Sequence, residues 1–166
     1  VTLGGLWICL WRGKMRAFGV IPIVLAACLL PLVPKPDVLA ADYGDLFAVR
    51  GDDGKLWFSS GRSGKFVRNE WLQLESGSQD FGVWPVGEEE GSAPAFLSCD
   101  ASSCEYKMKG QSISFVLQPD GLQAACEKSA VVFSHLDLEN NGCRSRLRDK
   151  WKIHHTGAEA VYLSQE

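Results

Sequence analysis

Histidine is scarce in this sequence, and the few histidines do not form a pattern typical of an active site. The 166 residues contain three of them. A metallohydrolase needs several convergent His and Asp ligands and one open coordination position. His135 and Asp137 share one face of an extended segment, whereas the adjacent His154 and His155 would point to opposite faces of a strand. A hydrolase site built from His135, Asp137 and one of the two later histidines is the enzymatic alternative.

Motifs for a nucleophile or a bound phosphate are missing as well. No serine lies in a Gly-x-Ser-x-Gly elbow between a strand and a helix. Residues 59–64 (SSGRSG) are rich in Gly and Ser but lack the spacing of a phosphate loop. We therefore predict that the chain is not an enzyme and assign it no catalytic residue, no metal ligand and no cofactor.

Acidic residues are absent from positions 1–35, which carry four basic residues instead. Residues 17–33 are uncharged and would span about 25 Å as a helix, near the lower limit for crossing a bilayer. This pattern predicts a transmembrane helix over 17–33, a basic cytoplasmic loop over 12–16, and the end of a preceding span over 1–11. Residues 36–166 then form an exported domain on the far side of the membrane, either periplasmic or extracellular.

Two other interpretations of the apolar segment stay open. Met15 is a possible start of a signal peptide, with residues 39–41 (LAA) as its cleavage site. Residues 25–28 (LAAC) resemble a lipobox that would place a lipid on Cys28. All three interpretations export the domain. The apolar stretch over 1–11 further suggests either a piece of a longer membrane protein or a reading frame that begins at a non-Met codon.

Positive charge is also sparse after residue 35. The net charge of the whole chain is −3, but residues 36–166 hold 13 Lys and Arg against 20 Asp and Glu, which gives −7. An acidic domain repels phosphate backbones, so nucleic-acid contact would need a local basic strip. One candidate strip exists, and its alternating pattern is more typical of the solvated face of a strand: Arg144, Arg146, Arg148, Lys150 and Lys152.

Four cysteines lie in residues 36–166, an even number that suits two disulfides. Four cysteines allow three pairings. Cys99 and Cys104 bracket a four-residue turn and are placed to face each other across a hairpin, which leaves Cys126 for Cys143. The alternatives are free thiols or a four-cysteine metal site, although the spacings lack the paired short knuckles of zinc ribbons. Cys9 and Cys28 lie in apolar runs and are interpreted as inert thiols.

The pattern of residues 36–166 predicts a small α+β domain. Strands are expected from residue 37 and over 46–50, 55–59, 95–99, 104–108, 112–117, 130–134, 151–154 and 158–163, with a short one near 81–84. Helices are expected over 64–74, with Ser63 as the N-cap, and over 119–126. Asp53-Gly54 marks a hairpin turn. The predicted core consists of Trp57, Phe58, Trp71, Phe96, Phe115, Val131 and Val132.

Several segments resemble the C-terminal region of ComEC-family competence proteins of alphaproteobacteria. They are LGGLWICLWRGKMR, PDVLAADYGDLFAVRGDDGKL, FVRNEWL, LSCDASSCEYKMKGQSISFVL and GAEAVYLS. The resemblance implies a polytopic inner-membrane channel for DNA uptake in natural transformation. In many members the tail is a metallo-β-lactamase-like domain with a His-x-His-x-Asp-His motif, which this sequence lacks. The resemblance thus implies a shortened, metal-free relative of that domain.

These observations predict the last part of a ComEC-like protein, with a tail that is structural or gating. Its partner would be the rest of a membrane channel. Any contact with DNA would come through that channel. Two alternatives remain: a degenerate metal-dependent hydrolase or nuclease, and a membrane-anchored exported binding module.

Overall fold

The computed structural model describes residues 2–11, 13–29, 32–76, 80–86, 94–138, 143 and 146–164. The chain divides into two compact units, residues 1–35 and 36–166. Each unit is described here by itself.

The first unit is built from two short apolar helices and a short 3₁₀ helix that carries basic residues. Helix α1 (Thr2–Leu10) is followed by a 3₁₀ helix, η1 (Lys14–Gly19), and by α2 (Val20–Leu29). Glycines allow close packing, because a Cβ atom added to Gly4 would lie 2.7 Å from the carbonyl oxygen of Gly19. Trp7 stacks on Trp11 with 5.0 Å between ring centroids, and its Nε1 donates to the carbonyl of Met15 at 3.1 Å.

The predicted transmembrane helix over 17–33 is wrong. Among the described residues, no helix has both the length and the apolar character needed to cross a membrane. The uncharged run is divided between the end of η1 and the ten-residue α2, which at 1.5 Å per residue is about half as long as a bilayer core is thick. The nine-residue α1, predicted as the end of a preceding span, is shorter still.

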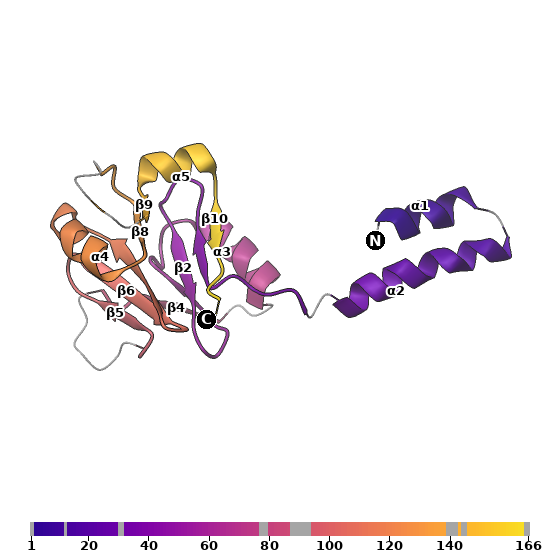
Figure 1. The fold of residues 1–166 in the computed structure, drawn as a ribbon, viewed down its shortest axis with the longest axis horizontal. Coiled ribbons are helices and arrows are strands. Elements are labelled where there is room, and N and C mark those ends of the chain that lie inside the picture. Colours follow the sequence, from indigo (N-terminus) through magenta and orange to yellow (C-terminus); the bar gives the residue numbers. More distant parts are fainter. Residues whose placement is uncertain are drawn as a thin grey trace. The chain divides into compact units, whose positions relative to one another are not determined.

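The second unit contains two five-stranded sheets (Figure 1). Sheet A has the order β10-β1-β2-β3-β4, and only the β3–β4 pair is parallel. Its strands are β1 (Val38–Ala40), β2 (Phe47–Arg50), β3 (Leu56–Phe58), β4 (Phe81–Val83) and β10 (Glu159–Val161).

Sheet B has the order β5-β6-β7-β8-β9, with β8 parallel to both of its neighbours. Its strands are β5 (Leu97–Cys99), β6 (Ser103–Met108), β7 (Gln111–Val116), β8 (Val131–Ser134) and β9 (Arg146–Arg148). The apolar run over 130–134 is therefore a buried interior strand, as its sequence predicted.

Helices cover the outer faces of the two sheets. Helix α3 (Lys65–Trp71) continues into a π-helical turn and packs on sheet A through a cluster that includes Leu46, Phe58 and Leu72. Helix α4 (Leu122–Lys128) follows a 3₁₀ turn, η4 (Pro119–Gly121), and packs on sheet B around Ala125. Figure 1 shows α3 and α4 on opposite sides of the sheets.

The main core lies between the sheets. Phe47 from sheet A contacts Phe115 and Phe133 from sheet B, with ring centroids 5.4 and 5.9 Å apart. Of the predicted core residues, Phe58, Phe115 and Val132 are fully buried. Trp57, Phe96, Val131 and Trp71 are only partly buried and pack against the edges of the clusters.

Two local predictions are wrong. Residues 151–154 are not a strand but part of helix α5 (Lys150–Thr156), which Asp149 caps by accepting a hydrogen bond from the Lys152 amide at 2.8 Å. The N-cap of α3 is Gly64 rather than Ser63, with φ 59° and no side-chain cap bond. A left-handed backbone at that position suits glycine.

Candidate functional site: a polar junction cluster

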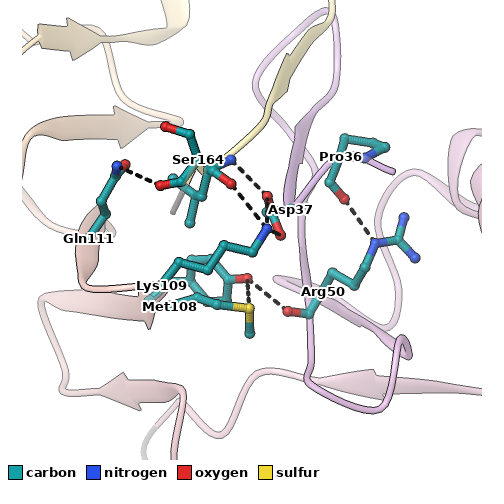
Figure 2. Close-up of polar contacts among 9 residues, drawn as sticks. Pro36, Asp37, Arg50, Met108, Lys109, Gln111 and Ser164 are labelled. Carbon is teal, nitrogen blue, oxygen red and sulfur yellow. Dashed lines mark hydrogen bonds and ion pairs between the residues drawn. The ribbon is translucent and has the colours of Figure 1, made fainter. Parts of the chain in front are cut away.

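The strongest polar arrangement lies where the chain enters the second unit. We call it the junction cluster and define it as the side chains of Asp37, Arg50, Tyr106 and Lys109 with the backbone of Leu163 (Figure 2). Asp37 directly precedes β1 and is buried with 6% exposure. Its carboxylate accepts hydrogen bonds from Lys109 Nζ at 2.9 and 3.0 Å and from the Leu163 amide at 2.7 Å.

Lys109 reaches Asp37 from the tight turn between β6 and β7. Lys109 and Gly110 both have positive φ angles, 54° and 76°, as a two-residue type I′ turn requires. Lysine is an unusual residue at such a position. Its ammonium also donates to the Leu163 carbonyl at 3.1 Å, so one side chain binds the start of β1 and the segment after β10.

Arg50 and Tyr106 extend the cluster inward. Arg50 Nε donates to the carbonyl of Pro36 at 2.9 Å, and Tyr106 Oη donates to the carbonyl of Arg50 at 2.8 Å. Burial of the phenol is the largest cause that raises the pKa of Tyr106, and the negative charges of Asp37 and Asp52 raise it further. Tyr106 thus stays a neutral hydrogen-bond donor at physiological pH.

The chemistry of this cluster is that of a structural joint. The Asp37 carboxylate is buried and accepts three hydrogen bonds from two donor groups, and the ammonium of Lys109 is shared between a carboxylate and a carbonyl. All three hydrogen-bond donors of the Lys109 ammonium are used in these contacts. The cluster fixes the first residues of the unit to both sheets and to the last described segment of the chain.

Histidines are placed away from any catalytic arrangement among the described residues. His135 and Asp137 are both exposed after the end of β8. His154 and His155 lie on α5. His154 stacks on Tyr43 with ring centroids 5.1 Å apart, and His155 lies tilted against Trp151 at 4.1 Å. Within the described parts of the chain, no three His, Cys, Asp or Glu side chains lie close enough together to hold a metal ion.

The basic strip does not form one strand face. Arg146 and Arg148 belong to β9, whereas Lys150 and Lys152 belong to α5, and Arg144 lies outside the described residues. Arg148 Nε lies 3.4 Å from Glu159, and Lys152 Nζ donates to the Leu147 carbonyl at 3.2 Å.

Two disulfides connect the four cysteines of the second unit. Cys99 pairs with Cys104, and Cys126 pairs with Cys143. The first joins opposite positions of β5 and β6, as the hairpin prediction proposed. The second ties α4 to the segment before β9. Cys9 and Cys28 are free.

Sequence reasoning missed the junction cluster. Asp37 and Lys109 are 72 residues apart, and nothing local in the sequence couples them. The unusual Lys-Gly pair between two predicted strands was the one available signal, since a lysine at a position that favours Asn or Gly suggests a side-chain role.

Comparison with protein-family models, with curated proteins and with solved structures finds no match.

Proposed function

We propose that residues 36–166 are a structural, non-catalytic tail of a ComEC-like DNA-uptake protein, and that the tail faces an oxidising compartment such as the periplasm. The observation that carries the structural role is the junction cluster. A buried carboxylate directly after the apolar unit is bound from both sheets at once. These hydrogen bonds hold residue 37 in a fixed position relative to both sheets of the domain.

The choice of the ComEC family rests on the resemblance of the quoted segments. The choice of compartment is supported by the two disulfides, because disulfides persist in oxidising environments and are rare in reducing ones. In this proposal the rest of the channel protein is the partner of the tail, and DNA passes through that channel rather than being cut by this domain.

The main alternative is a metal-dependent hydrolase that uses His135, Asp137 and one of His154 or His155. The structural proposal is favoured because both members of the first pair are exposed and because the described residues do not bring three such ligands together. The anchored binding module is the second alternative, and it is distinguished by the coding frame before Val1: a frame that continues into further apolar segments favours the channel protein.

A paired set of substitutions tests the proposal in the host cell. We would introduce Asp37→Ala in one strain and Asp137→Ala in another, and measure the amount of labelled DNA that becomes resistant to added nuclease. Protein levels would be compared by immunoblot. We expect Asp37→Ala to reduce DNA uptake and Asp137→Ala to leave it unchanged.

The opposite result would overturn the proposal. A loss of uptake in the Asp137→Ala strain at normal protein level favours the hydrolase. Normal uptake in the Asp37→Ala strain, together with normal uptake after deletion of residues 36–166, removes any role of the tail in DNA transport.

A further inference from the structure

The turn between β5 and β6 is organised by one carboxylate. Asp100 Oδ1 accepts hydrogen bonds from the Ser102 amide at 2.7 Å, the Ser103 amide at 2.6 Å and the Ser102 hydroxyl at 2.9 Å. The Ser103 hydroxyl donates to Oδ2 at 3.3 Å. The Asp100 amide in turn donates to the Ser103 carbonyl at 2.8 Å. The carboxylate therefore holds the chain reversal from inside the turn.

This reversal brings two thiols together. Cys99 and Cys104 are the residues directly outside the turn and are paired opposite each other in the β5–β6 ladder. The four hydrogen bonds of the Asp100 carboxylate all lie within residues 100–103, so they can form before distant parts of the chain are in place. In the folded domain the Ser102 carbonyl also accepts hydrogen bonds from the amides of Leu117 and Gln118, at 2.8 and 3.0 Å. Side-chain bonds of this kind from Asp to nearby amides are a general means of stabilising local turns.

The second disulfide depends on distant structure. Cys126 lies on α4 and Cys143 lies 17 positions later, with β8 between them. The reduced chain offers three ways to pair its four domain cysteines. A turn that closes the first pair early removes the two other pairings and leaves Cys126 for Cys143.

We propose that Asp100 is a positioning residue for oxidation of the domain: its carboxylate folds the turn before the sheets form and selects the Cys99–Cys104 disulfide. The oxidant is a small disulfide or a dithiol–disulfide oxidase. One cysteine thiolate attacks the oxidant's disulfide and releases one thiolate from it. The second cysteine thiolate then attacks the mixed disulfide, the new S–S bond forms, and the oxidant leaves as two thiols that carry the two electrons and the two protons.

The charge state of Asp100 suits this role. Partial burial acts to raise the pKa of its carboxyl, but the four hydrogen bonds from Ser102 and Ser103 outweigh burial and lower the pKa below the usual value of 3.8. The group is therefore ionised wherever thiolates are available for exchange, and an ionised carboxylate is the stronger acceptor.

Early trapping of disulfides tests the proposal. The reduced, unfolded full-length chain would be diluted from guanidinium into mild detergent with oxidised glutathione, and samples would be quenched with acid after short times. Free thiols are then alkylated and the linked peptides quantified by mass spectrometry. The variants are Asp100→Ala, Asp100→Asn and the control Asp120→Ala, which removes an exposed acid from the neighbouring η4 turn.

We expect Cys99–Cys104 to be the main first disulfide in the unmodified chain. In Asp100→Ala its share of the early single-disulfide species should fall about three- to tenfold, as expected for loss of a net hydrogen-bond contribution. Asp100→Asn should stay within about twofold of the unmodified chain, because the amide oxygen keeps the turn. Asp120→Ala should have no effect. In concentrated guanidinium all four chains should give the same distribution.

These measurements do not require a variant to reach the native fold, since they concern species trapped before folding is complete. Equal early shares of Cys99–Cys104 in the unmodified chain and in Asp100→Ala would overturn the proposal. A difference that persisted in concentrated guanidinium would also overturn it, because the turn is not formed there.

Discussion

At the scale of single residues, the Asp37 carboxylate links two segments that are far apart in the sequence, the turn between β6 and β7 and the segment after β10. We expect Asp37→Asn to lower the free energy of unfolding by about 2–4 kcal/mol, because it leaves the partly buried Lys109 ammonium without its counter-charge. Chemical denaturation of the purified protein measures this change.

Asp80→Asn is the matched control for Asp37→Asn. Asp80 pairs with Lys55 at 3.0 Å, but its side chain is 77% exposed. Exposed ion pairs contribute little, so the loss should stay below about 1 kcal/mol. Equal losses for the two substitutions would contradict the assignment of Asp37 as the buried centre of the junction cluster.

Tyr106 gives the domain a specific response to alkaline pH. Burial and nearby carboxylates raise the pKa of the phenol above its usual value of 10.0. As the pH rises past 10.0, the unfolded chain loses this proton first. The stability contributed by the neutral phenol is therefore complete below that pH and is lost as the pH rises toward the folded-state pKa.

We expect Tyr106→Phe to remove this alkaline dependence. At neutral pH the variant should be less stable by about 1–2 kcal/mol, because the Arg50 carbonyl loses its buried donor. Above pH 10.0 the difference between the two proteins should shrink. Denaturation curves at a series of pH values measure both effects, and parallel pH profiles would contradict the prediction.

At the scale of elements, α5 is a case in which alternation of charged and apolar residues predicts the wrong secondary structure. Charged and apolar residues alternate over 150–153, which predicted a strand, yet the segment is a helix with Ile153 buried and the other side facing outward. The helix signals were present at its ends, with Asp149 as the N-cap and Gly157 as the C-cap. Whether such a short segment forms a helix or a strand depends on its capping residues and on its one buried residue, and four alternating positions are too few to predict it.

The Cys126–Cys143 disulfide is expected to contribute to stability because it ties α4 to the segment before β9. Replacing both cysteines by serine should lower the free energy of unfolding by about 2–4 kcal/mol, since the reduced unfolded chain regains the entropy of the open loop. Thermal and denaturant unfolding would measure the loss.

Cys9→Ser with Cys28→Ser is the control for that pair, because both thiols are free and exposed in the first unit. This double substitution should leave the unfolding of residues 36–166 unchanged. A loss as large as that caused by removing Cys126 and Cys143 would argue against a specific effect of the disulfide.

At the scale of the whole molecule, the two compact units predict independent folding of the second. A fragment of residues 36–166 should unfold cooperatively, with a melting temperature within a few degrees of the full chain. Its three apolar clusters are formed by residues after position 36 alone. Calorimetry of the fragment and the full chain makes the comparison. A fragment without a cooperative transition would contradict the division.

The first unit shows how far an uncharged run can be interpreted. Seventeen residues without charge suggested one continuous span, but continuity of the helix is not fixed by hydropathy. The chain changes from 3₁₀ to α geometry at Val20, and the resulting helix is too short to cross a membrane. Length in residues sets an upper limit on a helix, and local backbone geometry sets its actual extent.

The sequence by itself determined the features that depend on local signals. Hairpin dipeptides, alternating apolar residues and the turn between Cys99 and Cys104 predicted most strands of the second unit, the α+β class and the existence of two disulfides. Those signals act over a few residues, so they are visible in a single chain. The sequence also changes sharply in composition at residue 35, the last residue of the first compact unit.

Only the tertiary structure decided which distant residues meet. It assigned the strands to two sheets, placed Phe58 rather than Trp71 in the fully buried core, and joined Asp37 to Lys109 and Leu163. The physical reason is that a buried charge is tolerated only where a partner is brought to it, and that partner can come from anywhere in the chain. Neither periodicity nor residue spacing in the sequence predicts a contact between such distant residues. The junction cluster can therefore be found only in the folded protein.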